Sequence, residues 1–221
     1  AQSGCRVALL PAAASTLFEF EAIEGVVGEP ALDTQGDPIL SSELAFGRSD
    51  AVYFAPLSAG DIDRDCYRLA RDLGKRSFLD AQGLTRQLPT EENRRFAFSV
   101  LSLIDVVKVT IAEASWLFGT DQPAAVQAAF KALGVSEIAL TAGAGGSFAL
   151  SEDGIFEIGA EPLLDAIDTV GCGDVYFASY IDARLDGHTP EVAAQMAAAA
   201  VSRKLRGEDL RSAPQRMATS A

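Results

Sequence analysis

Short runs of β-forming residues alternate with helix-like patterns from about residue 49 to the end of the chain. Apolar residues dominate these runs and turn-forming residues bound them, which predicts buried strands. The runs lie at 51–55, 77–80, 106–109 and 137–141. A later pair, at 147–151 and 154–159, is joined through Glu152, Asp153 and Gly154 and predicts a β-hairpin.

Between the strands, apolar residues recur at helical spacing. We expect helices over 61–73, 91–104, 111–118, 123–133, 174–186 and 190–205. Asp61 is the expected N-cap of the first helix, and Thr189 is that of the last. The stretch 81–90 is expected to be a loop. Strands that alternate with helices predict an α/β fold with a mostly parallel sheet and helices on both faces.

Residues 1–48 differ in character from the rest of the chain. Segments 5–11 and 16–23 predict a pair of strands, whereas 25–41 contains Gly and Pro and predicts a loop. We therefore expect two parts: a small β-rich appendage over 1–48 and an α/β body over 49–221.

Charge and composition argue against several classes of function. The 221-residue chain has a formal net charge of −13, so nucleic acids and anionic membranes are not expected as partners. It has no long apolar run and begins without a basic leader, which favours a cytoplasmic location. Its three cysteines are far apart, which argues against a disulfide framework, and its single histidine, His188, excludes a multi-histidine metal site.

The stretch DTVGCGD, residues 168–174, lies directly before an apolar run with helical spacing. A Gly-x-Gly turn at a helix start presents backbone N–H groups, and together with the helix dipole these can hold an anion. Asp174 lies beside that position, where it could accept a proton from a hydroxyl that attacks a phosphorus atom. From spacing alone, an ordinary helix start whose Asp complements the dipole is equally compatible.

Two further segments could contribute to such a site. TAGAGGS, residues 141–147, follows a strand, and its glycines could let a phosphate approach the backbone or could only make a tight connection. Phe148 stands where a dinucleotide fingerprint needs its third glycine, which argues against a nicotinamide-dependent oxidoreductase. Glu113 follows the strand at 106–109, where it could hold Mg²⁺ through water or only favour the helix start.

Taken in order, these segments resemble the PfkB (ribokinase-like) family of carbohydrate and nucleoside kinases. DTVGCGD is similar to that family's DTxGAGD signature, VVKVTIAEA to its KxNxxE segment and LTAGAGGSFAL to its TxGxxG segment. FLDAQGLTR and MAAAAVS also have counterparts, so the resemblance covers about residues 50–206. It implies a ribokinase-like three-layer α/β sandwich in which the appendage at 1–48 is a lid.

The resemblance also implies roles for individual residues. Asp174 would be the catalytic base, and the N–H groups of Gly171, Cys172 and Gly173 would stabilise charge on the transferred phosphoryl group. Glu113 would organise Mg²⁺ and its waters. The residues implied to bind the nucleotide or other cofactors are Thr141, Gly143, Gly146, Asp168 and Lys108. The region of Asp168 helps to hold a monovalent cation in some relatives.

The implied function is an ATP- and Mg²⁺-dependent kinase that phosphorylates a hydroxyl of a sugar or polyol. Lids in this family can cap a partner's active site, so a homodimer through residues 1–48 is a further expectation. Thr110 stands where the family usually has Asn, and the family's N-terminal acceptor-binding region has no counterpart here. These departures motivate an alternative, a non-catalytic nucleotide-binding or regulatory relative. Cys172 replaces the usual Ala or Ser, either to fill a small space or as a reactive thiol.

Overall fold

The computed structural model describes residues 10, 12–19, 22–23, 26–27, 31–44, 47, 49–86, 90–161, 169–208 and 210. The chain divides into two compact units, which we describe one at a time. The first consists of Ala1–Asp105 with Leu133–Val135, and the second of Val106–Ala132 with Ser136–Ala221.

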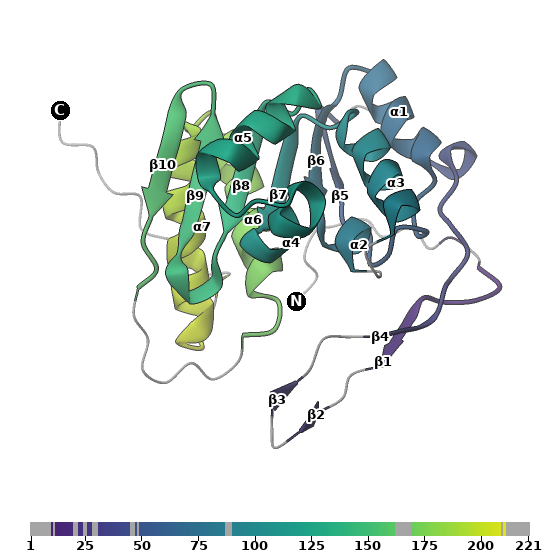
Figure 1. The fold of residues 1–221 in the computed structure, drawn as a ribbon, viewed down its shortest axis with the longest axis horizontal. Helices are drawn as coiled ribbons and strands as arrows, with labels where there is room; N and C mark the ends of the chain where they lie inside the picture. The colour runs from purple at the N-terminus through teal and green to yellow at the C-terminus, as the bar shows by residue number, and fades with distance from the viewer. Residues whose placement is uncertain are drawn as a thin grey trace. The chain divides into compact units, whose positions relative to one another are not determined.

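Six of the described strands form one sheet in the order β10-β9-β8-β7-β6-β5 (Figure 1). They are β5 (Ala51–Phe54), β6 (Arg76–Asp80), β7 (Val106–Thr110), β8 (Glu137–Thr141), β9 (Ser147–Ser151) and β10 (Gly154–Ile158). β5 pairs with β6 and β7 with β8 in parallel, whereas β9 and β10 form the predicted antiparallel hairpin. The predicted α/β class and mostly parallel sheet are confirmed.

In the first unit, α1 (Arg64–Asp72) begins later than the sequence suggested. Its N-cap is Asp63, whose side chain accepts a hydrogen bond from Asp65 N at 2.8 Å, so the prediction of Asp61 as N-cap is wrong. The Asp61 carboxylate is engaged in the preceding turn, because it accepts hydrogen bonds from Leu57 N at 2.7 Å and Ser58 N at 2.8 Å.

The loop expected at 81–90 contains a short helix, α2 (Gln82–Thr85). It begins where Gln82 N donates to the buried Asp80 carboxylate at 3.0 Å, and Gly83 lets the helix lie against Pro56. A Cβ on Gly83 would lie 2.1 Å from the Pro56 carbonyl oxygen. The next helix, α3 (Glu91–Leu101), starts as predicted, and Thr90 accepts a hydrogen bond from Asn93 N at 3.1 Å.

The N-terminal appendage is a pair of small antiparallel ladders. Within the described residues these are β1 (Leu17–Glu19) with β4 (Ala31–Thr34), and β2 (Ala22–Ile23) with β3 (Val26–Val27). The prediction of a loop throughout 25–41 is therefore wrong. Strands β3 and β4 are stabilised by hydrogen bonds to partner strands, and runs this short do not indicate such partners in the sequence. Except for residue 10, the strand predicted at 5–11 lies outside the described residues.

Side-chain interactions anchor this appendage within the first unit. Asp61 accepts hydrogen bonds from Thr16 Oγ1 at 2.7 Å and Gln35 Nε2 at 2.9 Å. The Arg86 guanidinium lies over the Phe18 ring, 4.5 Å from its centroid. The division at residue 48 stays a prediction.

The second unit contains four α-helices in its described part: α4 (Ile111–Phe118), α5 (Pro123–Ala132), α6 (Cys172–Leu185) and α7 (Pro190–Leu205). Figure 1 shows α5 in front of strands β8 and β9, and α7 behind β9 and β10. α6 and α7 pack closely, and Ala193, Ala194 and Ala197 of α7 are fully buried. α6 begins at Cys172 rather than at the predicted Asp174.

None of the helices in the described part of the chain is both long enough and apolar enough to span a bilayer.

Candidate active site

The first turn of α6 brings most of the predicted catalytic residues together. Gly171 is the N-cap, with φ 75° and ψ 6°, a left-handed conformation that only glycine adopts easily. A Cβ at this position would lie 3.7 Å from Asp174 Oδ2, so the Asp174 carboxylate lies over the N-cap. Asp174 N and its neighbours in the first turn are the N–H groups that an α-helix leaves without intrahelical partners.

One of the three expected anion-binding groups has a partner in the structure. The Cys172 N–H donates to the Thr169 carbonyl at 3.2 Å. This bond is long, so a bound anion could compete for the same N–H group. Asp168, which the resemblance implied to bind a cofactor, lies outside the described residues.

Lys108 extends from β7 to the same helix start. The residue is only 4% exposed, and its Nζ lies 3.2 Å from the point that a Cβ on Gly173 would occupy. A lysine buried in a strand thus ends with its ammonium group beside the first turn of α6. Although the chain has a net charge of −13, the Lys108 ammonium and the helix dipole both favour binding of an anion at this helix start.

A second lysine approaches the helix start from α7. Lys204 Cε lies 3.9 Å from the Cβ position of Gly171, and the residue is half-buried. Sequence reasoning missed Lys204, because it lies in the last turn of a long helix and belongs to none of the motifs.

The glycine-rich segment after β8 forms a compact loop. A short 3₁₀ helix, η2 (Gly143–Gly145), is closed by a hydrogen bond from Ala142 N to the Gly146 carbonyl at 2.8 Å. Gly146 has φ 91°, and a Cβ there would lie 2.3 Å from the Ile158 carbonyl. Glycine is therefore required at this position by the backbone alone, whether or not the loop binds a ligand.

Glu113 and Thr110 cap the start of α4 reciprocally. Thr110 N donates to Glu113 Oε2 at 2.8 Å, and Glu113 N donates to Thr110 Oγ1 at 3.1 Å. Thr110 also pairs with Thr141 across β7 and β8, so this capping box lies next to the start of the glycine loop. Among the described residues, no cluster of three or more His, Cys, Asp or Glu is arranged to hold a metal ion. The Mg²⁺ role of Glu113 stays a prediction.

Tyr176 links α6 to the glycine loop. Its hydroxyl donates to Ser147 Oγ at 2.9 Å, and both residues are buried, at 5% and 2% exposure. Burial raises the pKa of Tyr176 to about 12, although the Ser147 hydrogen bond lowers it slightly, so the phenol keeps its proton at neutral pH. This bond could not be predicted from the sequence, because Tyr176 belongs to an apolar run that predicts only core packing.

The other end of α6 is fixed by an ion pair between the half-buried Arg184 and the buried Glu137 at the start of β8. Arg184 Nε and Nη2 donate to the two carboxylate oxygens of Glu137, each at 2.8 Å. The Tyr180 hydroxyl donates to Glu137 Oε1, also at 2.8 Å. Burial and the adjacent Glu137 carboxylate raise the pKa of Tyr180, and the hydrogen bonds to Glu137 raise the pKa of Arg184. α6 is thus held at both ends.

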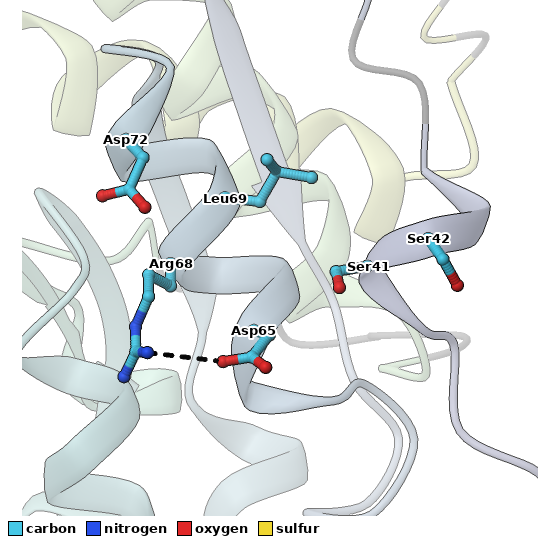
Figure 2. A pocket seen from close by; sticks show the side chains of 6 residues that line it. All are labelled: Ser41, Ser42, Asp65, Arg68, Leu69 and Asp72. Atoms are coloured by element: carbon cyan, nitrogen blue, oxygen red, sulfur yellow. Dashed lines mark ion pairs between the residues drawn. The ribbon is translucent and has the colours of Figure 1, made fainter.

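The first unit has an open hollow beside α1, drawn in Figure 2. Its volume is about 300 Å³, and an exposed ion pair between Arg68 and Asp65, 3.7 Å long, lies at its edge. The lining residues are Ser41, Ser42, Asp65, Arg68, Leu69 and Asp72. None of these residues was predicted to take part in chemistry.

The family model of the pfkB carbohydrate kinases matches residues 27–214 of this chain. The chain therefore belongs to the pfkB family, and the resemblance found in its motifs is confirmed. No curated protein sequence matches it significantly.

Solved structures with a similar fold are ribokinase-family kinases. A pyrophosphate-dependent myo-inositol-1 kinase converted into a myo-inositol-3 kinase is 25% identical, with a TM-score of 0.74 over 91% of this chain and 70% of that one. A pyrophosphate-dependent kinase complexed with a pyrophosphate analogue and myo-inositol is 26% identical, with a TM-score of 0.69 over 80% of this chain and 66% of that one.

A more distant structure supports the fold alone. Arabidopsis thaliana ribokinase, complexed with ribose and ATP, is 22% identical, with a TM-score of 0.58 over 71% of this chain and 50% of that one. The predicted ribokinase-like fold is thereby confirmed. This chain spans 63% to 70% of the length of the pyrophosphate-dependent kinase structures.

Proposed function

We propose that this protein is a phosphotransferase that moves a phosphoryl group from a phosphate donor to a hydroxyl of a small sugar or polyol. The observation that supports this most strongly is the first turn of α6. There the Asp174 carboxylate lies over Gly171, and the buried Lys108 ammonium lies beside Gly173. A carboxylate at a helix start that has N–H groups without intrahelical partners and a neighbouring lysine suits a reaction in which a base acts beside a phosphate.

In the proposed mechanism, Asp174 accepts the proton of the acceptor hydroxyl as that oxygen attacks the terminal phosphorus of the donor. A new phosphorus–oxygen bond forms, the bond to the leaving phosphate breaks, and the leaving group departs with the electron pair. The N–H groups of Gly171, Cys172 and Gly173, together with Lys108, stabilise charge on the phosphoryl oxygens during transfer.

The residues present are compatible with Mg²⁺ bound mainly by the donor. Mg²⁺ keeps several waters and needs only one or two carboxylates in addition to phosphate oxygens. Glu113 would orient such waters while it caps α4, and the ion would neutralise part of the phosphate charge. A monovalent cation held near Asp168 belongs to the same proposal.

ATP is the donor that the family motifs imply, with Thr141, Gly143 and Gly146 along its phosphates. Pyrophosphate is a second candidate, because the structures at 25–26% identity and TM-scores of 0.66 to 0.74 are pyrophosphate-dependent kinases. Both donors carry a terminal phosphate joined through a phosphoanhydride bond, and the α6 helix start would bind that phosphate in the same way. We propose that the acceptor is a neutral polyhydroxy compound, and that a homodimer through residues 1–48 is one possible assembly.

The test is direct phosphoryl transfer by the purified protein. Each donor, ATP and pyrophosphate, is supplied with Mg²⁺ and a panel of sugars and polyols that includes myo-inositol and ribose, and phosphorylated product is detected by mass spectrometry. We expect product with at least one donor. Donor binding in calorimetry without any product across the panel would contradict the proposal and favour the non-catalytic, regulatory alternative that Thr110 suggested.

A further inference from the structure

The hydrogen bond between Tyr176 and Ser147 joins two parts of the proposed site that are far apart in the sequence. Tyr176 lies two residues after Asp174 on α6, and Ser147 is the first residue of β9. The bond is 2.9 Å long and buried on both sides. Because water is excluded there, a lost hydroxyl cannot simply be replaced by solvent.

Ser147 is placed so that its position fixes the end of the glycine loop. It follows Gly146 directly and pairs with Thr141 across the β8–β9 ladder, so these two residues flank the loop 142–146. The loop's own hydrogen bonds, such as Ala142 N to the Gly146 carbonyl, determine its shape. They do not determine where the loop lies relative to the first turn of α6.

We propose that the Tyr176–Ser147 hydrogen bond is a positioning link that holds the glycine loop in a fixed place relative to Asp174. This inference rests on the proposed function, in which donor phosphates contact both the loop and the α6 helix start. Without the link, the two contact surfaces would drift relative to each other, and the donor phosphorus would be less well aligned with the attacking oxygen. Tyr176 therefore acts through its neighbours and touches neither substrate.

Tyr180 provides a matched control on the same helix. It lies one turn further along α6, is fully buried, and its hydroxyl donates to Glu137 Oε1 at 2.8 Å. Glu137 begins β8, whereas the glycine loop follows the end of that strand. Tyr180→Phe thus removes an equally buried phenol hydroxyl of α6 at a distance from the loop.

The experiment compares Tyr176→Phe, Ser147→Ala, the double variant and Tyr180→Phe with the wild type. For each protein, kcat and KM are measured for donor and acceptor, donor Kd is measured by calorimetry, and Tm is measured by thermal unfolding. We expect Tyr176→Phe and Ser147→Ala each to lower kcat/KM for the donor roughly tenfold and to weaken donor binding, because small misalignments are costly in transfer reactions. The acceptor KM should change by less than about twofold, since the link lies on the donor side.

The double variant should be no worse than either single variant, because each removes the same interaction. Tyr180→Phe should lower Tm at least as much as Tyr176→Phe, because its hydroxyl donates to a carboxylate, but should leave the kinetic constants within about twofold of the wild type. Two results would overturn the positioning role while leaving the proposed function intact. One is equal kinetic constants for Tyr176→Phe and Tyr180→Phe. The other is a double variant whose loss of kcat/KM for the donor equals the product of the two single losses. A wild type that binds neither ATP nor pyrophosphate would overturn the proposed function and this inference together.

Discussion

Replacing Gly173 with alanine separates two roles of the α6 helix start, its contribution to stability and its electrostatic contribution to phosphate binding. Gly173 is the second residue of α6, and alanine is favoured over glycine in a helix by roughly 0.5–1 kcal/mol. The added Cβ would lie 3.2 Å from Lys108 Nζ and 3.6 Å from its Cε, which is tighter than an ordinary contact. The end of a lysine side chain can shift by the few tenths of an ångström required.

We therefore expect Gly173→Ala to leave the free energy of unfolding equal to the wild-type value or higher by up to about 1 kcal/mol. Phosphoryl transfer should nevertheless fall roughly ten- to a hundredfold, because the methyl group displaces the ammonium and occupies space beside the phosphate. Urea denaturation and steady-state kinetics on the same preparation check both halves of the prediction.

Lys108→Met supplies the control for this prediction. If Gly173→Ala acts by displacing the Lys108 ammonium, it should have little further effect on turnover when that ammonium is already absent. Wild-type turnover by Gly173→Ala would refute the placement of the donor phosphate against this turn. A loss of several kcal/mol in stability would instead show that the Lys108 side chain cannot yield.

Three further predictions concern other parts of the chain. Arg184→Met leaves the buried Glu137 carboxylate without its cation, so urea denaturation should show a loss of about 3–5 kcal/mol; a loss below 1 kcal/mol would contradict the buried pair. Burial raises the pKa of Asp61, but hydrogen bonds from Thr16, Ser58 and Gln35 outweigh this and hold it below 3.8. The resulting stabilisation is present above the pKa of Asp61 in the unfolded chain and is lost as the pH falls through its folded pKa. Below about pH 4, the free energy of unfolding of the wild type should therefore fall more steeply with pH than that of Asp61→Asn. Parallel curves of unfolding free energy against pH would contradict this. Iodoacetamide should modify the half-buried Cys172 before Cys66, because burial raises the pKa of Cys66 to about 11, and bound donor should protect Cys172; mass spectrometry that finds Cys66 modified first would contradict this.

The sequence was most informative where a feature is local. The apolar runs and the hairpin turn around Asp153 and Gly154 predicted β9 and β10, and Thr189 followed by Pro190 predicted the start of α7, because these signals act within a few residues. Asp61 and Asp63 show the limit of this reasoning. Both could cap α1, and the choice depends on which carboxylate the preceding turn already uses.

Features that depend on distant partners could not be predicted. Helix α2 forms where Gly83 approaches Pro56, and no pattern within residues 81–90 records that contact. Lys108 was expected to bind a cofactor, but the position of its ammonium beside Gly173 follows from the packing of α6. The partner of the Tyr176 hydroxyl, Ser147, is 29 residues away in the sequence, at the start of β9.

In the proposed reaction, Asp174 acts as a base beside a phosphate bound at the start of α6. The most direct test of this role measures the rate of phosphoryl transfer and the donor Kd for wild type and Asp174→Asn, with the donor and acceptor that the wild type uses. Asparagine has nearly the same shape but cannot accept the proton. We expect a rate loss of roughly 10²- to 10⁴-fold, typical of a removed general base, with donor affinity unchanged or tighter. Turnover by Asp174→Asn at the wild-type rate would contradict this role.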